Sequence, residues 1–467
     1  MGVSYMKTRR FFSLFLLISL IASLCCTPLA LAIEAEKPQL APDPKILAKA
    51  ALLVDPETGD TAYALNEHEE LYPASLTKIM TTLLVLEAID EGILSLSQEI
   101  TASSTAFAGL SPDGSNAGIK AGEVMSVENL LYCVMVVSAN EACNILAEAV
   151  SGSVEAFVEK MNQRSAELGC KNTQFRNPNG LHDPGHYTSA WDLYLITKEA
   201  MKHDLFVTIS DTANVKIPAT NLHEERNYWT TNHLLSTWRV IGYLDKRAHG
   251  IKTGSTDAAG HCLVSSATQG SMTYISVILG AERVEENGVG NIRSFSETSR
   301  MFDYGFENFS YKTILQKSEP IKDVTVTLSK TDHVALRPAK DIEKLMPKGL
   351  EAEHLERTVT LDSEVVEAPV EAGQKLGTLT LSYEGREYAT VDLLAMNAVE
   401  ASRLLVFWRD VQEFFSRTSV RLVLVLLAVA IAAALLWKLV FGKRRYRYGR
   451  SVSRRGGGGY RGRKRRY

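Results

Sequence analysis

Ser75 and Lys78 stand three positions apart, shortly after Pro73, in the stretch YPASLTKIM. On a helix, residues i and i+3 share a face, so the amine of Lys78 can reach the hydroxyl of Ser75. A serine hydroxyl is a poor nucleophile until a neighbouring base takes its proton. The pair therefore has the residue types for acyl transfer. The spacing alone proves little, because Ser4 and Lys7 share it.

Two further motifs follow the serine–lysine pair. Ser138 and Asn140 form a Ser-x-Asn motif that starts 63 residues after Ser75. A Lys-Thr-Gly motif, 252–254, starts 112 residues after Asn140, on a predicted edge strand that precedes a buried hairpin. Each motif alone is a weak signal. Their order, their separations and their predicted elements together indicate one catalytic site.

This set of motifs resembles the serine penicillin-binding proteins and β-lactamases, and is most similar to the low-molecular-mass D-alanyl-D-alanine carboxypeptidases. The likeness covers about residues 40 to 400. It includes the loop RNPNGLHDPGHYTSAWDL and the stretch VEAPVEAGQKLGTLTL, which is similar to the family's C-terminal β domain. The resemblance implies an α/β fold of the β-lactamase/transpeptidase type, with mixed helices and antiparallel sheet. It also implies peptidoglycan stem peptides as substrates, β-lactams as inhibitors, and no cofactor.

The resemblance also implies a role for each residue of the first two motifs. Ser75 attacks the carbonyl between two D-alanines and forms an acyl-enzyme. Lys78 acts as the base, which requires a neutral amine; burial and the nearby Lys252 would both lower its pKa. Ser138 relays the proton to the leaving amine, and Asn140 holds Lys78 and the substrate amide.

The third motif is expected to bind the substrate. Lys252 and Thr253 suit a terminal carboxylate. The backbone N–H of Ser255, directly after Gly254, is the implied second donor to the oxyanion, beside the N–H of Ser75 at the helix N-terminus.

Both ends of the chain differ in composition from the body. Residues 1–32 carry Lys7, Arg9 and Arg10, an apolar run and an A-x-A site, as a secretory signal peptide does. Residues 422–441 form a run of 20 that is apolar except for Lys438, long enough to cross a bilayer. The twelve Lys or Arg residues of 443–467, without any acid, predict a cytoplasmic tail and an extracytoplasmic body.

The predicted organisation has six parts. They are a signal peptide (1–32), a serine DD-peptidase domain (40–312), a C-terminal β domain (318–396), an amphipathic linker helix (401–418), a transmembrane helix (422–441) and a basic tail (443–467). The spanning helix and the tail depart from the family, in which many members have only an amphipathic helix lying on the membrane surface.

Within the body, apolar spacing predicts the main elements. Hairpins are expected at 48–69 and 261–281, a helix over 127–150 and a closing helix over 292–309.

Charge and metal-binding residue types exclude several function classes. The formal net charge of −3 combines fifteen cationic residues in the two end segments with −18 on residues 33–442, so no nucleic-acid partner is expected for the body. The body has four cysteines and no C-x-x-C pair, which argues against a zinc or redox site and leaves disulfides open. His182 and His186 have a metal-ligand spacing but lie in a Pro/Gly loop without clustered acids, so no metal is expected.

Two alternative functions remain from the sequence. A serine β-lactamase would need a glutamate for rapid deacylation, and no E-x-x-L-N-like stretch lies between 141 and 190. A catalytically silent cell-wall scaffold would not require the three intact motifs.

Overall fold

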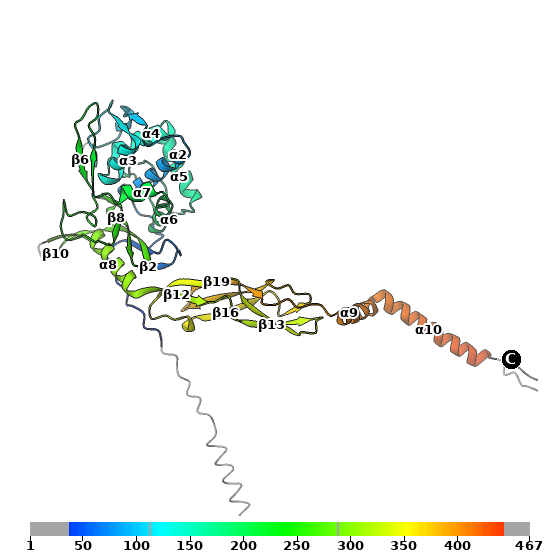
Figure 1. The fold of residues 1–467 in the computed structure, drawn as a ribbon. Helices are drawn as coiled ribbons and strands as arrows, with labels where there is room; N and C mark the ends of the chain where they lie inside the picture. The colour runs from blue at the N-terminus through cyan, green and yellow to red at the C-terminus, as the bar shows by residue number, and fades with distance from the viewer. Residues whose placement is uncertain (1–36, 112–113, 287–288, 443–467) are drawn as a thin grey trace, which may run out of the picture. The chain divides into compact units, whose positions relative to one another are not determined.

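The computed structural model describes residues 37–111, 114–286 and 289–442 (Figure 1). The predicted signal peptide and basic tail lie outside the described residues. The chain divides into two compact units. One holds the residues up to Lys317 together with Lys340–Thr358 and Thr380–Thr390, and the other holds the remaining residues.

A five-stranded antiparallel sheet forms the centre of the first unit. Its order is β2 (Thr61–Leu65), β1 (Ala50–Val54), β9 (Met272–Ala281), β8 (Gly260–Gln269) and β7 (Ala248–Thr256). The two predicted hairpins are confirmed as the β1–β2 and β8–β9 pairs. The Lys-Thr-Gly motif lies on β7, so its predicted place on an edge strand is also confirmed.

Helices cover both faces of this sheet. Successive side chains of a strand point to opposite faces. In β1, Ala50, Leu52 and Val54 join the core on one face, while Ala51 and Leu53 join the core on the other. The first face is covered by α2 (Lys78–Asp90), α3 (Val127–Val136), α4 (Asn140–Ser151), α5 (Val154–Glu167), α6 (Ala190–Ala200) and α7 (Asp204–Ser210). The second is covered by α8 (Arg293–Asn308), the predicted closing helix (Figure 1).

The prediction of one continuous helix over 127–150 is wrong. The structure breaks it into α3 and α4, and Ser138 between them has a φ of 64°. Such a left-handed residue cannot continue a right-handed helix. The apolar spacing persists through the break because both helices pack on the same core, so the periodicity hides it.

Short elements complete the first unit. They are the pairs β3 (Glu99–Thr101) with β4 (Val124–Ser126), β5 (Asn214–Ile217) with β6 (Arg226–Trp229), β10 (Arg283–Glu286) with β11 (Val289–Ile292) and β12 (Phe309–Leu315) with β15 (Ile342–Pro347), and the 3₁₀ helices η1 (Ala74–Thr77), η2 (Thr105–Phe107) and η3 (Ala352–His354). The β3–β4 and β5–β6 pairs matter most, because Ser115 in the β3–β4 connection and Thr231, shortly after β6, lie at the candidate site.

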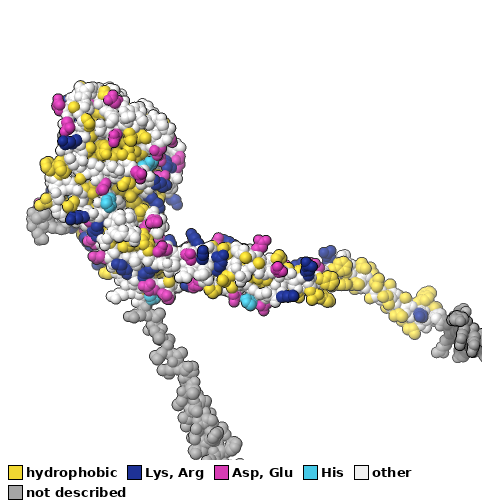
Figure 2. All heavy atoms as spheres, viewed as in Figure 1, with side chains coloured by type: hydrophobic (Ala, Val, Ile, Leu, Met, Phe, Trp, Pro, Cys, Tyr) yellow, Lys and Arg dark blue, Asp and Glu magenta, His cyan; other side chains and the backbone are white. Residues whose placement is uncertain are grey.

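A small, separate sheet follows, as the sequence predicts. Its strand order is β16 (Glu356–Leu361), β18 (Lys375–Tyr383), β19 (Arg386–Ala395), β14 (His333–Pro338), β13 (Lys322–Thr327) and β17 (Val365–Glu367). Two helices end the described chain: α9 (Arg403–Ser416), which exposes Leu404, Trp408 and Phe415, and α10 (Thr418–Phe441). The 24 residues of α10 are long and apolar enough to span a membrane, and hydrophobic side chains cover the helix (Figure 2).

Candidate active site

Ser75 and Lys78 meet where η1 passes into α2. Ser75 lies in the 3₁₀ turn and Lys78 is the first residue of the α-helix. The Lys78 Nζ atom donates to the Ser75 Oγ atom at 2.9 Å. The predicted contact between Ser75 and Lys78 is therefore present in the fold.

The Lys78 side chain is fully buried. Besides Ser75, its Nζ atom donates to the Asn140 Oδ1 atom at 2.8 Å and to the Asn179 carbonyl at 2.5 Å. Burial lowers the pKa of Lys78 to about 8, while Cys143 and Glu141 act in the opposite direction. With that pKa, a useful fraction of the amine is neutral near pH 7, as a general base requires.

Ser138 reaches the same cleft from the junction of α3 and α4. Its side chain is 3% exposed, and its Oγ atom has no hydrogen-bond partner among the described residues. A buried hydroxyl without a partner is costly. A substrate atom could supply that partner. The left-handed backbone at this residue also lets Asn140 begin α4, where its side chain meets Lys78.

Lys252 and Thr253 occupy β7. Lys252 is fully buried, and its Nζ atom donates to the Thr253 carbonyl at 3.0 Å. Burial, and then repulsion from Lys78, holds the pKa of Lys252 well below its ordinary value. The hydroxyls of Thr253 and Thr231 are hydrogen-bonded at 2.6 Å. Thr253 lines the cleft, and the buried Lys252 amine lies behind it.

Gly254 allows β7 to approach Ser75 closely. A Cβ atom at this position would lie 2.9 Å from the Pro73 carbonyl oxygen and 3.2 Å from the Ser75 nitrogen. Only glycine fits such an approach without moving η1. This contact brings the next residue, Ser255, beside Ser75.

These residues surround a cleft of about 240 Å³. Its lining is Ser75, Ser115, Ser138, Thr231, His233, Thr253, Gly254, Ser255, His261, Cys262, Ile292, Ser294 and Phe295. The structure thus brings together all eight residues proposed from the sequence, five on the cleft surface and three, Lys78, Asn140 and Lys252, enclosed behind it.

The loop 176–189, noted in the sequence for its likeness to the family, has a supporting role that its residue pattern does not predict. Within it, the Asn179 carbonyl accepts from Lys78, and Gly180 packs so closely on the Ala74 carbonyl that a Cβ atom there would overlap it. His186 was expected to be a loop residue rather than a metal ligand, and it lies in this loop. It is buried, and it accepts from the Arg176 N–H at 3.3 Å and donates through Nε2 to Thr77 at 2.9 Å. Thr77 donates in turn to the Ala74 carbonyl, which holds the turn that carries Ser75.

His186 should make the fold less stable in mild acid. Burial lowers its pKa to about 4, against about 6.5 for an unfolded histidine. Between these values the unfolded chain binds a proton that the native chain does not, so stability falls as the pH drops from about 6.5 to 4, by up to roughly 3 kcal/mol. Thermal unfolding at several pH values should show a shallower pH dependence for His186→Gln than for the wild type. The exposed His182→Gln is the control; an unchanged slope in His186→Gln would contradict this role.

The fold, together with a serine hydroxyl in contact with a buried lysine, is typical of the serine peptidases. The chain belongs to the D-alanyl-D-alanine carboxypeptidase family of peptidases, whose sequence pattern matches residues 36–283. Residues 309–401 match the C-terminal domain of penicillin-binding protein 5. The predicted resemblance and fold class are therefore confirmed.

Relatives cover most of the chain. The D-alanyl-D-alanine carboxypeptidase DacF of Bacillus subtilis is 32% identical over 360 residues, 77% of this chain and 88% of that protein. DacC of Escherichia coli is 32% identical over 76% of this chain and 85% of its own length. The crystal structure of penicillin-binding protein 5 from Haemophilus influenzae matches with a TM-score of 0.61 and 30% identity, over 77% of this chain and 99% of that chain.

Proposed function

We propose that this chain removes the terminal D-alanine from peptidoglycan stem pentapeptides and is inhibited by β-lactams. The observation that carries the proposal is the 2.9 Å contact from the Lys78 amine to the Ser75 hydroxyl at the floor of an open cleft. The names of the relatives, D-alanyl-D-alanine carboxypeptidases, support the substrate class.

The reaction has two stages. The Ser75 Oγ atom bonds to the carbonyl carbon of the penultimate D-alanine, and its proton passes to neutral Lys78. As the C–N bond breaks, a proton passes through the unpartnered Ser138 hydroxyl to the leaving amine, and D-alanine departs. Water then attacks the acyl-enzyme, which releases the shortened peptide and restores Ser75. Asn140 keeps Lys78 in place and offers its amide to the substrate.

Substrate binding is assigned to β7 and η1. The backbone N–H groups of Ser75 and Ser255 form the oxyanion hole, which the close approach at Gly254 supports. Thr253 contacts the terminal carboxylate. The pKa of Lys252, enclosed behind Thr253, is lowered in the free protein, and a carboxylate bound nearby favours the charged form of this amine.

A free terminal carboxylate should therefore matter for turnover. A charge-assisted hydrogen bond contributes about 1.5–3 kcal/mol, so a pentapeptide ending in D-alanyl-D-alanine should be cleaved roughly tenfold to a hundredfold better than its C-terminal amide. The measurement is kcat/KM for both peptides with the full-length protein in detergent. Lys252→Ala should narrow the ratio of the two values. Because Lys252 and Lys78 also repel each other, the ratio is more informative than either rate.

Equal kcat/KM for the pentapeptide and its C-terminal amide would show that Thr253 and Lys252 do not bind the terminal carboxylate. A penicillin label that forms and is then hydrolysed rapidly would instead indicate a β-lactamase. A chain that neither labels nor releases D-alanine would indicate a scaffold protein.

The C-terminal helix α10 is compatible with a membrane anchor. We propose a single-pass protein with the catalytic body outside the cytoplasm and the tail, 443–467, inside it. Protease added to intact spheroplasts should digest the body and spare an epitope at Tyr467. Loss of that epitope while a cytoplasmic marker survives would reverse the orientation.

A further inference from the structure

The loop segment Ser115–Glu123, here called the wall segment, has no regular structure and reaches the catalytic cleft at its first residue. Ser115 lines the cleft, and its carbonyl accepts the N–H of Asn140 at 2.9 Å. The N–H groups of Ala117 and Ile119 donate to the Glu141 Oε1 atom at 2.7 and 3.3 Å. The wall segment is therefore bonded directly to the first turn of α4, which carries Asn140.

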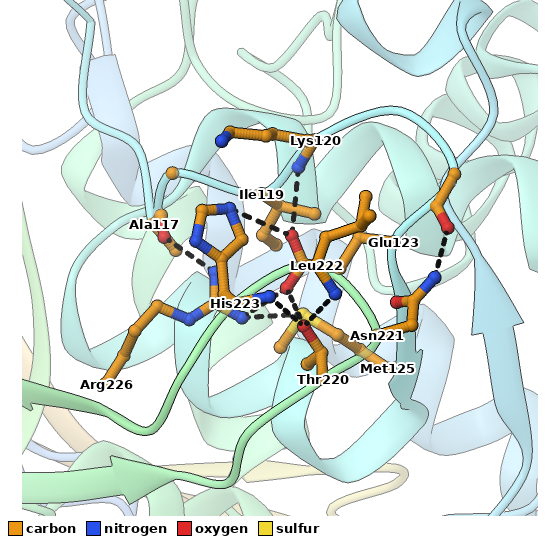
Figure 3. Close-up of polar contacts among 12 residues, drawn as sticks. Ala117, Ile119, Lys120, Glu123, Met125, Thr220, Asn221, Leu222, His223 and Arg226 are labelled. Carbon is orange, nitrogen blue, oxygen red and sulfur yellow. Dashed lines mark hydrogen bonds and ion pairs between the residues drawn. The ribbon is translucent and has the colours of Figure 1, made fainter.

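The far end of the wall segment carries a fully buried carboxylate, Glu123. Its Oε1 atom accepts from the Arg226 guanidinium at 2.5 Å and from the Thr220 hydroxyl at 2.8 Å. Its Oε2 atom accepts from the Lys120 N–H at 3.1 Å and lies 3.6 Å from the His223 ring (Figure 3). Burying a carboxylate is costly unless it is paired and hydrogen-bonded, and these donors provide that pairing for Glu123.

Arg226 holds the wall segment at two points. Its Nη2 atom pairs with Glu123, while its Nη1 atom donates to the Ala117 carbonyl at 3.2 Å (Figure 3). The Tyr228 hydroxyl donates to the same carbonyl. Arg226 thus ties the backbone next to Ser115 to strand β6.

Strand β6 leads into the opposite wall of the cleft. Five residues after Arg226, Thr231 lines the cleft and bonds to Thr253 at 2.6 Å. We propose that the Glu123–Arg226 pair is a positioning device that holds the wall carrying Ser115 and Asn140 at a fixed separation from the wall carrying Thr231 and Thr253. The inference rests on the proposed function and adds two positioning residues to it.

The separation of the walls decides whether a bound amide meets both Ser75 and the groups that hold its ends. A misplacement of about 1 Å costs on the order of a hundredfold in rate. Arg226→Lys keeps the positive charge, but its compact ammonium does not reproduce the planar fork that reaches Glu123 and Ala117 together. This substitution therefore tests whether the double contact of Arg226 with Glu123 and Ala117 matters, independently of its positive charge.

The test compares Arg226→Lys with Arg164→Lys in the full-length protein. Arg164 also joins several partners, Glu87 at 2.8 Å and Glu199 at 3.2 Å, but it lies on α5, away from the cleft lining. Competent sites are first counted by exhaustive titration with a fluorescent penicillin. The acylation rate per competent site, and KM for the pentapeptide, are then measured well below the unfolding temperature.

A loss of folded protein lowers the number of competent sites but not the rate of each. Displaced walls lower the rate per site and raise KM. We expect Arg226→Lys to reduce the rate per site about tenfold to a hundredfold, and Arg164→Lys to leave it unchanged. A rate per site equal to the wild type in Arg226→Lys, or an equal loss in both variants, overturns the inference.

Glu123→Gln is the second variant should Arg226→Lys fail to fold. It keeps the size of the side chain and removes the charge that pairs with Arg226, so a several-fold loss per site is expected. No loss per site in this variant overturns the inference as well. Failure of the proposed function is distinguishable, because the wild type itself would then neither label nor release D-alanine.

Discussion

Replacing Ser75 with alanine is expected to abolish both covalent labelling by a fluorescent penicillin and release of D-alanine. Without the hydroxyl there is no acyl-enzyme, so the loss should be of the order of 10⁴-fold or more. The protein should stay folded, because the substitution removes one partly exposed hydroxyl that accepts from Lys78. A labelling gel and a D-alanine assay on the same preparation check both results.

The matched control is another serine with a structural task. Ser153 caps α5 by accepting the Ala156 N–H at 3.2 Å, so Ser153→Ala should lower stability by about 1 kcal/mol and leave labelling intact. Undiminished labelling of Ser75→Ala would show that another residue is the nucleophile.

Replacing Lys78 with arginine should slow acylation by roughly 10²- to 10⁴-fold, the usual contribution of a general base. Arginine keeps the positive charge but stays protonated at every accessible pH, so it cannot take the proton of Ser75. In the wild type, neutral Lys78 accumulates as the pH rises towards its pKa of about 8. The second-order labelling rate should therefore rise about tenfold per pH unit below 8 and level off above it.

The variant should lose this pH dependence as well as the rate. Lys160→Arg, an exposed position on α5, is the control and should match the wild type at every pH. A wild-type rate that does not change between pH 6 and 8 would contradict the assignment of Lys78 as the base.

The sequence was sufficient for the parts of the site that rest on local spacing. The i, i+3 relation predicts the Ser75–Lys78 contact, and alternating apolar residues predict the hairpins that put Lys-Thr-Gly on an edge strand. These relations involve neighbours in the chain, so a pattern can reveal them.

The missing parts depend on contacts between distant segments. The Asn179 carbonyl is a backbone acceptor that no side-chain pattern marks, and it lies 101 residues from Lys78. Arg226 and Glu123 are separated by 103 residues, and each alone looks like a surface charge. The break at Ser138 is hidden because the apolar positions on both of its sides face one core.

The edge position of β7 has a consequence for selectivity. None of the described strands pairs with the side of β7 that faces away from β8. An extended peptide can lie along such an edge as an added strand, held by main-chain hydrogen bonds. Main-chain bonds do not distinguish one side chain from another. Variation in the middle residues of the peptide should therefore be tolerated. Discrimination should concentrate at the peptide's terminus, which we propose contacts Thr253 and Ser75.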